Sequence, residues 1–524
     1  KQFITMRNSA IFLFLFLVLG SCKNSSTPTE SMATYETPLY QEPHRPQYHF
    51  TPREKWMNDP NGLVYYKGVY HLFYQYYPED IVWGPMHWGH ATSTDLVHWE
   101  HKPIALFPDQ HGYIFSGSAV VDFENTSGLG TKENPAMIAI FTYHLMEGEK
   151  AGKTDYQTQG IAYSLDGGDS WEMYAENPVI GNPGIKDFRD PKVFWNEKTN
   201  AWSMLLVAGD HLQIWGSNNL IDWEQQSEFG KNQGAHGGVW ECPDLFSFTD
   251  QATGTEKWVL FISINPGAPN GGSGTQYFVG DFDGKTFVSD QKEDQWVDWG
   301  TDNYAGVTYN HTPDGSRLFI GWMSNWLYAQ NTPTERWRSA MTLPRILSLK
   351  DVQGVPTLFS TPAPAWNDLG NDNEGKDVSI AAGQSIVTYS EDLNQSKIDF
   401  IWDGSAMSIS FVNQKQERLS IHLDPENQQM SIDRSASGLV DFQEDFKTIQ
   451  TGLIGDLPPK DIPVAIFLDQ SSVEIFLNNG QKVMTAQFFN SLDFNQLKIE
   501  NNTAETHVYR GLKITPIQSI WDAE

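Results

Sequence analysis

Three short segments place a carboxylic acid next to residues that restrict the backbone or exclude water. Asp59 and Asp190 are each followed by a proline, and Glu241 follows a tryptophan. Singly, each segment is typical of a strand start or of a structural ion pair. If the three acids converge, they could cleave a glycosidic bond, because that reaction needs a proton donor for the leaving oxygen and an anion beside the developing oxocarbenium carbon.

The rest of the chain must bring these acids together, and its sequence is typical of β-strands. Short runs rich in Val, Ile, Phe, Tyr and Trp alternate with Gly, Asn, Asp and Pro clusters, with almost no helical period. A turn-like segment recurs at residues 93–99, 164–171 and 217–223, with a related one at 281–284. The repeat predicts a five-bladed β-propeller, whose inner strands would gather distant acids around one axis. A large β-sandwich with similar turns is the alternative.

The composition changes after this repeat region and predicts a second domain. Residues 346–375 are rich in Pro, Gly, Asn and Asp, and we expect them to form a linker. Residues 376–524 alternate apolar and polar positions in hairpin-like pairs, which favours a β-sandwich. The predicted fold is therefore all-β, with a five-bladed β-propeller over residues 46–345 followed by a C-terminal β-sandwich. We expect the sandwich to brace the propeller or to shape a remote part of the substrate cleft.

The N-terminal residues have the pattern of an export signal. An apolar run over residues 10–20 follows Arg7 and ends in small residues before Cys22, which resembles a bacterial lipoprotein signal. We expect residues 1–22 to be this signal, Cys22 to carry the lipid, and residues 23–45 to be a flexible tether. The protein would then be exported and lipid-anchored to the bacterial cell envelope, with no other membrane contact. An ordinary signal peptide with a chance cysteine is the alternative.

Charge and motif spacing exclude several other functions. Asp and Glu number 65 against 35 Lys and Arg, and the net charge of −30 would repel nucleic acid. The histidines at 87, 90, 98 and 101 lack a cysteine or acid at ligand spacing, so no metal site is expected. The glycine-rich residues 265–274 lack the Lys-Ser/Thr pair of a phosphate loop. We therefore expect no cofactor.

The three acid-bearing segments resemble the signature motifs of a known enzyme family. The segments WMNDPNG, FRDPKV and WECPDLF are similar to the three motifs of glycoside hydrolase family 32, which contains fructan hydrolases and invertases. Residues 73–76, 83–90, 115–118 and 321–326 also match, in the family's order. The resemblance implies a five-bladed propeller followed by a β-sandwich, in agreement with the repeat and the alternation.

The resemblance also implies residue roles and a mechanism. By motif, Asp59 would be the nucleophile, Glu241 the general acid/base and Asp190 the transition-state stabiliser that binds fructose hydroxyls. The mechanism would be retaining, which requires the Asp59 and Glu241 carboxyls to lie about 5–5.5 Å apart. The substrate-binding residues implied by the family pattern are polar groups that bind hydroxyls and aromatic walls: Asn58, Gln75, Ser116 and Arg189, and Trp83, Phe115 and Trp326.

The fuller resemblance is to bacterial levanases and exo-inulinases. It implies an exo-acting β-fructosidase that releases fructose from levan-type or inulin-type fructans, with sucrose as a further substrate. An endo-levanase with an open groove, releasing fructo-oligosaccharides, is one alternative. A non-catalytic fructan-binding lipoprotein is another, although the presence of all three acids argues against it.

Overall fold

The computed structural model describes residues 37–250, 253–366 and 374–521. The predicted signal and Cys22 lie outside these residues. Within the described part of the chain, no helix has the length and apolar character needed to cross a membrane. The helices in this part are short: α1 (Met146–Lys150) and the 3-10 helices η1 (Ala329–Asn331), η2 (Pro364–Trp366), η3 (Leu393–Gln395) and η4 (Glu444–Lys447).

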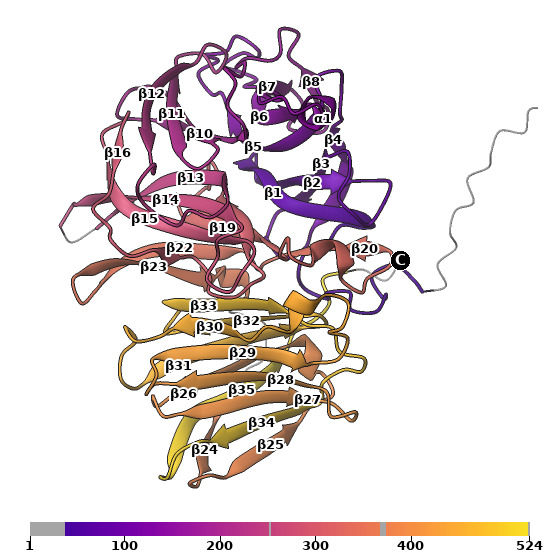
Figure 1. The fold of residues 1–524 in the computed structure, drawn as a ribbon, viewed down its shortest axis with the longest axis vertical. Coiled ribbons are helices and arrows are strands. Elements are labelled where there is room, and N and C mark those ends of the chain that lie inside the picture. Colours follow the sequence, from indigo (N-terminus) through magenta and orange to yellow (C-terminus); the bar gives the residue numbers. More distant parts are fainter. Residues whose placement is uncertain (1–36, 251–252, 367–373, 522–524) are drawn as a thin grey trace, which may run out of the picture. The chain divides into compact units, whose positions relative to one another are not determined.

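Over the described residues between 55 and 362, the strands form five successive sheets around a ring. The first strand of each sheet contacts the first strand of the next, and the fifth contacts the first, which closes the ring (Figure 1). We call these five the ring strands: β1 (Lys55–Tyr66), β5 (Tyr113–Val121), β9 (Phe188–Asn196), β13 (Val239–Thr249) and β18 (Tyr304–Thr308).

The remaining strands extend each sheet outward by antiparallel pairing. The exception is β20, which pairs in parallel with the other edge of β1. The first sheet adds β2 (Val69–Tyr77), β3 (His87–Ser93), β4 (Glu100–Leu106) and β20 (Trp337–Arg338). The second adds β6 (Met137–His144), β7 (Gln157–Ser164) and β8 (Glu172–Met173), and the third β10 (Ala201–Ala208), β11 (Leu212–Ser217) and β12 (Glu224–Phe229). The fourth adds β14 (Glu256–Asn265), β15 (Gly274–Phe282), β16 (Phe287–Val288) and β17 (Gln295–Trp296), and the fifth β19 (Arg317–Met323), β21 (Ala340–Met341), β22 (Arg345–Val352) and β23 (Val355–Pro362).

The repeated turn segment connects the third and fourth strands of the first three sheets. In the first copy, Ser93 Oγ accepts a hydrogen bond from the Leu96 amide at 2.8 Å. In the third copy, Ser217 Oγ accepts the equivalent bond from the Leu220 amide at 2.9 Å. Because serine, aspartate and asparagine side chains satisfy backbone donors in such turns, the sequence repeat reports a repeated hairpin.

One strand closes the first sheet from a distant part of the chain. Strand β20 pairs in parallel with β1, matching Lys55 with Trp337 and Trp56 with Arg338. The first sheet is thus completed by residues that follow the second strand of the fifth sheet.

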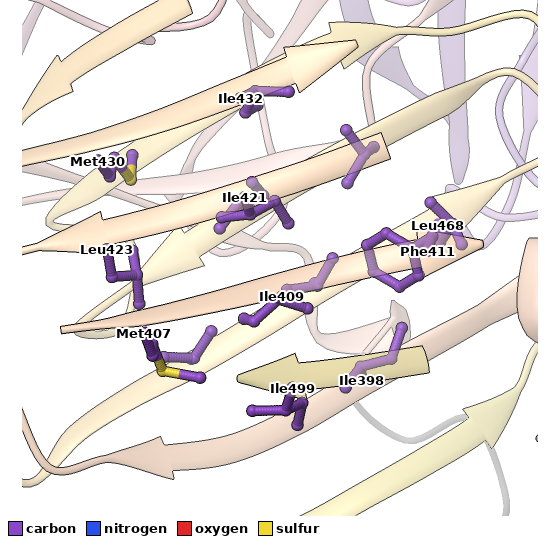
Figure 2. Packing of buried hydrophobic residues seen from close by; sticks show 14 of the residues in the cluster. Ile398, Met407, Ile409, Phe411, Ile421, Leu423, Met430, Ile432, Leu468 and Ile499 are labelled. Atoms are coloured by element: carbon purple, nitrogen blue, oxygen red, sulfur yellow. The ribbon is translucent and has the colours of Figure 1, made fainter. Parts of the chain in front are cut away.

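The C-terminal strands form two six-stranded sheets in the described part of the chain. In sheet order, one contains β24 (Lys376–Ile380), β35 (His507–Pro516), β26 (Ser396–Trp402), β31 (Ile462–Asp469), β32 (Ser472–Leu477) and β33 (Lys482–Gln487). The other contains β25 (Ser385–Tyr389), β34 (Gln496–Asn501), β27 (Met407–Val412), β28 (Arg418–Asp424), β29 (Gln429–Ala436) and β30 (Gln450–Leu453). Alternate residues such as Ile409, Ile421 and Ile499 point into a shared core with Ile398 and Leu468 (Figure 2). Two sheets that bury one face each in this way form a sandwich.

A buried ionic cluster joins the sandwich to the rest of this compact unit. The Arg345 guanidinium, at the start of β22, binds Glu474 of β32 and Asp298, with an Nη1–Oδ2 distance of 3.0 Å to the latter. Glu474 also lies 2.9 Å from His49, whose other ring nitrogen lies 2.8 Å from Asp469. All five side chains are fully or almost fully buried. We call them the interface cluster.

Two predicted segment boundaries are wrong. Residues 345–362 form the hairpin β22–β23 of the fifth sheet, inside the range expected to be a linker. Its turn residues Gln353 and Gly354 both have positive φ, as a tight two-residue hairpin requires. In the predicted tether, Tyr40 and Arg45 are buried, and Arg45 donates hydrogen bonds to Glu42 and to the Pro52 carbonyl. The ordered chain therefore begins before residue 45.

Candidate active site

The three predicted acids lie near the first residues of three ring strands. Asp59 is on β1, Asp190 on β9 and Glu241 on β13. Cys242, next to Glu241, connects the other two: its Sγ lies 3.5 Å from Asp59 Oδ2 and 3.6 Å from Asp190 Oδ2. The structure therefore brings the three acids together at one end of the ring, which we call the site end.

Irregular backbone at the site end aims these side chains. Each ring strand shifts register against its neighbour close to this end, which marks a β-bulge or a similar break in the ladder. Asp190 and Cys242 have positive φ values of 64° and 44°. The prolines that follow Asp59, Asp190 and Cys242 lie at these breaks, where the missing backbone N–H removes no ladder bond. Two of these prolines, those after Asp59 and Asp190, are the ones that drew attention in the sequence.

Asp59 is held by three donors. Ser116 Oγ donates to Asp59 Oδ2 at 2.7 Å, and Asn58 Nδ2 donates to Oδ1 at 3.1 Å. The Cys242 thiol also donates to Oδ2, with an Sγ–Oδ2 distance of 3.5 Å. Burial raises the pKa of Asp59 above its ordinary value, and the negative charge of Glu241 raises it further, whereas these three donors lower it. The donors fix both carboxylate oxygens and leave the side chain only partly covered.

Asp190 lies deeper and carries a perturbed pKa. Its Oδ2 accepts a hydrogen bond from the Cys242 amide at 3.0 Å, and its own amide donates to Thr142 Oγ1 at 2.9 Å. Burial raises the pKa of Asp190 to about 7; Arg189 lowers it, and the charges of Glu241 and Asp59 add to the rise. Strongly perturbed carboxylates that share a pocket are typical of catalytic sites.

Glu241 is positioned by a cation and a phenol. Arg189 Nη2 donates to Glu241 Oε1 at 3.0 Å, and Arg189 Nη1 also binds Asp187 at 2.8 Å. The Tyr304 hydroxyl, from the first residue of β18, donates to Glu241 Oε2. Burial and the charge of Glu241 hold the pKa of Tyr304 well above its ordinary value, so the phenol remains a donor.

Sequence reasoning missed Tyr304, although a positional signal was present. Tyr304 begins the fifth ring strand, and the acids and Ser116 lie at the equivalent starts of the other four. No proline or acid marks Tyr304 in the sequence, so only the ring order identifies it.

The predicted polar binding residues lie around the acids or beside them. Asn58 and Ser116 bind Asp59, as described, and Arg189 binds Glu241. Gln75, on β2, is buried and donates through Nε2 to Asn61 Oδ1 at 2.7 Å and to the Ile114 carbonyl at 3.0 Å. Its amide thus ties β1 to β5 near the residues that hold Asp59.

The three predicted aromatic walls are half-buried. Trp83 meets Phe115 edge-on with ring centroids 6.1 Å apart, and Phe115 stacks on His144 at 4.2 Å. Trp326 stacks on Trp56, two residues before Asn58, at 5.8 Å. Aromatic faces therefore stand on two sides of the acids. Within the described residues, no cluster of three His, Cys, Asp or Glu side chains is arranged to hold a metal ion.

The clustered acids on a closed ring of β-sheets, followed by a β-sandwich, define a glycoside hydrolase, and comparison with known proteins agrees. The chain belongs to glycosyl hydrolases family 32: the family's N-terminal domain matches residues 49–362 and its C-terminal domain matches residues 369–516. Solved structures of that family have an N-terminal propeller and a C-terminal β-sandwich, and this chain matches them.

Similar proteins cover nearly the whole chain. A levanase of Bacillus subtilis (strain 168) is 44% identical over 498 residues, which span 93% of this chain and 72% of the levanase. An extracellular exo-inulinase of Aspergillus awamori is 40% identical, over 92% of this chain and 96% of its own. The crystal structure of exo-inulinase from Aspergillus awamori superposes with a TM-score of 0.85 at 39% identity, covering 92% of this chain and 100% of that chain. The β-fructofuranosidase of Schwanniomyces occidentalis in complex with fructosyl-erythritol has a TM-score of 0.80 at 32% identity, covering 92% and 99%.

Proposed function

We propose that this protein is an exo-acting, retaining β-fructosidase that releases fructose from the ends of levan-type or inulin-type fructans, and from sucrose. The observation that carries the proposal is the pairing of Asp59, held by three donors, with Glu241, held by Arg189 and Tyr304, at one end of the ring. The relatives named levanase and extracellular exo-inulinase support a fructan as the substrate.

The chemistry proceeds in two displacements. Asp59 attacks the anomeric carbon of a terminal fructosyl unit, the glycosidic C–O bond breaks, and Glu241 gives its proton to the departing oxygen. A water molecule then attacks the same carbon, Glu241 takes the water's proton, and the fructosyl–Asp59 bond breaks to release fructose and restore the carboxylate. Two inversions retain the anomeric configuration.

The other site residues bind the fructosyl unit. Asp190 and Arg189 bind its hydroxyls, and Arg189 also keeps Glu241 in place. Asn58, Ser116 and Gln75 complete the polar surface, while Trp83, Phe115 and Trp326 cover the apolar faces of the ring. These groups are preorganised by their bonds to one another, so binding requires little rearrangement.

The fold supports a matching domain assignment. We propose that the five sheets are the blades of a five-bladed propeller that extends to residue 362, followed by a short connection and a sandwich from residue 376. The closed sequence of contacts among the ring strands supports five blades.

We also propose that the chain is exported and attached by lipid at Cys22 to the bacterial cell envelope. The sequence pattern before Cys22 and the extracellular relatives support export. Expression with radiolabelled palmitate tests the anchor: the native chain should carry label in the membrane fraction, and Cys22→Ser should carry none. Equal labelling of the two would overturn the anchor.

Chromatography of early products from levan, inulin and sucrose tests the activity. Fructose as the sole small product from the first time points is the expected result for both polymers. Fructo-oligosaccharides appearing before fructose would indicate the endo-levanase instead. Retained levan binding with no release of sugar would indicate the non-catalytic binding protein.

A further inference from the structure

A cavity opens at the opposite end of the ring from the acids. Its volume is about 500 Å³, and it is lined by the last residues of ring strands, including Val121 of β5, Asn196 of β9 and Thr308 of β18. The acids lie near the first residues of the same strands. The cavity, which we call the far-end cavity, is therefore separate from the proposed active site.

The floor of the far-end cavity is an internally balanced ion pair. Lys192 Nζ donates to the Thr308 carbonyl at 2.6 Å and lies 3.2 Å from Asp244 Oδ2. Asp244 also accepts hydrogen bonds from the Thr308 amide and hydroxyl. These side chains satisfy one another, so the floor is a polar surface without a net charge to offer a ligand.

Aromatic rings form the walls and the rim. Phe123, two residues after the end of β5, is 49% exposed and rests edge-on against His311 with centroids 5.3 Å apart. Trp195 is half-buried and held by an edge contact with Trp202 at 5.1 Å. Flat rings fixed by such contacts provide stacking surfaces for the C–H faces of a sugar, at little entropic cost.

Polar groups stand among these rings. Arg317 is anchored by an Nε–H hydrogen bond to the Ser247 carbonyl at 3.2 Å, and its planar guanidinium carries further N–H donors. Lys198 Nζ pairs with Glu256 Oε2 at 2.7 Å on the same wall. A rigid donor and a charged pair beside aromatic surfaces suit a ligand with many hydroxyls, which can both donate and accept.

The charge of the lining selects against anions. Acidic side chains outnumber basic ones among the residues around the cavity, and burial lowers the pKa of His311 to about 4, so it adds no positive charge at neutral pH. An anion would be repelled. The volume lies within the range of about 300–1,000 Å³ that is usual for small-molecule sites.

We propose that the far-end cavity is a second, non-catalytic saccharide site that binds a short segment of β-fructan. The choice of fructan rests on the proposed function, because a polymer handled at the site end presents many identical segments near the far end. A second binding site raises the effective concentration of such a polymer at the enzyme. Phe123 and Trp195 provide the stacking surfaces and Arg317 the hydroxyl donors.

Fluorine NMR of the chain labelled with 5-fluorotryptophan separates the two sites. In the Glu241→Gln background, a β-fructan tetrasaccharide is titrated while two resonances are followed, that of Trp83 at the site end and that of Trp195 at the far end. Each resonance is assigned by its loss in the corresponding Trp→Phe variant. Two saturating curves with different dissociation constants are expected.

Substitutions at the far end should affect only one of these curves. Arg317→Gln and Phe123→Ala should each weaken the Trp195 curve by about tenfold, equivalent to 1.4 kcal/mol, and leave the Trp83 curve unchanged. Phe123→Ala replaces an exposed ring, so it preserves the fold even if Arg317→Gln does not. Tyr389→Ala, at a 72% exposed ring of the sandwich, is the matched control and should change neither curve.

Three results would overturn the second site. The first is a Trp195 resonance that does not shift while the Trp83 resonance reaches saturation. The second is a Trp195 titration curve with the same dissociation constant as the Trp83 curve in every variant. The third is an equal shift of the Trp195 resonance with maltotetraose in place of the β-fructan. A Trp83 resonance that does not shift would instead count against the proposed function. The Trp195 titration curve would still show by itself whether the far-end cavity binds the saccharide.

Discussion

The acids at the site end and the acids of the interface cluster are both buried, but their charges are balanced differently. Glu474 meets Arg345 and His49, so each carboxylate of the cluster has a cationic partner. At the site end, Arg189 forms ion pairs with Asp190, Glu241 and Asp187. Three carboxylates thus share one guanidinium, and Asp59 lies beside them without a cationic partner of its own among the contacts of the described residues.

The pKa shifts follow this difference. Burial acts to raise the pKa of Glu474, but Arg345 and His49 outweigh it and hold that pKa below its ordinary value. At the site end, burial and mutual repulsion prevail, and the pKa values of Asp59 and Asp190 are raised. Paired charges stabilise the fold, whereas an uncompensated excess of carboxylates is typical of a catalytic site.

The largest expected effect comes from removing a reacting acid. Asp59→Asn and Glu241→Gln should each lower kcat on levan by more than about a thousandfold, because they remove the nucleophile and the proton donor. Urea unfolding should show no loss of stability, since both changes reduce repulsion among the carboxylates. An inactive variant that has also unfolded would argue against a catalytic role.

The reciprocal result is expected in the interface cluster. Glu474→Gln removes the carboxylate that Arg345 and His49 share and leaves them only Asp298 and Asp469 as counter-charges, so it should lower the free energy of unfolding by about 3 kcal/mol. Because the substitution is the same Glu→Gln change, it is the matched control for Glu241→Gln. The folded variant should keep kcat on sucrose within a factor of two to three of the native value, as expected for a site distant from the chemistry. A Glu474→Gln variant with native stability and a low kcat would contradict the assignment of a structural role to the interface cluster.

The cluster should also depend on pH through His49. Burial acts to lower the pKa of His49, but hydrogen bonds to Asp469 and Glu474 outweigh it and raise the pKa to about 9. A raised histidine pKa contributes stability that is complete below about pH 6.5 and is lost as the pH rises through 9. The stability difference between the native chain and His49→Gln should therefore shrink by up to about 3 kcal/mol between pH 6 and pH 9.5. Urea unfolding at both pH values measures it, and an unchanged difference would contradict the ion pair.

A second pH effect sharpens the contrast at the site end. Since the pKa of Asp190 is raised to about 7, the folded state holds a proton that the unfolded state releases near pH 4. Stability from this group is therefore present at low pH and falls between about pH 4 and 7, by at most about 1.4 kcal/mol per pH unit. Asp190→Asn should remove this slope, so its advantage over the native chain should grow from pH 4.5 to pH 7.5. A constant difference would show that Asp190 is ionised throughout this range.

Local signals in the sequence predicted the strand class and drew attention to three acids that the structure places together. The prolines after Asp59 and Asp190 marked breaks in ring strands, and the serine-containing turns marked hairpins. The Gln353–Gly354 turn was missed because the surrounding Pro, Gly and Asn residues are equally typical of a linker. Tyr304 binds Glu241, 63 positions away, and His49 pairs with Asp469, 420 positions away, and no local sequence pattern reports either contact.

The parallel pairing of β20 with β1 sets a condition on when the enzyme can mature. Strand β1, which carries Asp59, emerges early from the ribosome. Its parallel neighbour β20, residues 337 and 338, is synthesised only after the four other sheets have begun. Until then the start of β1 has an unpaired edge, although β18 is already present to close the ring against β1. A nascent or truncated chain ending just before residue 337 would therefore contain all five ring strands but lack the strand that pairs with Lys55 and Trp56, just before the nucleophile.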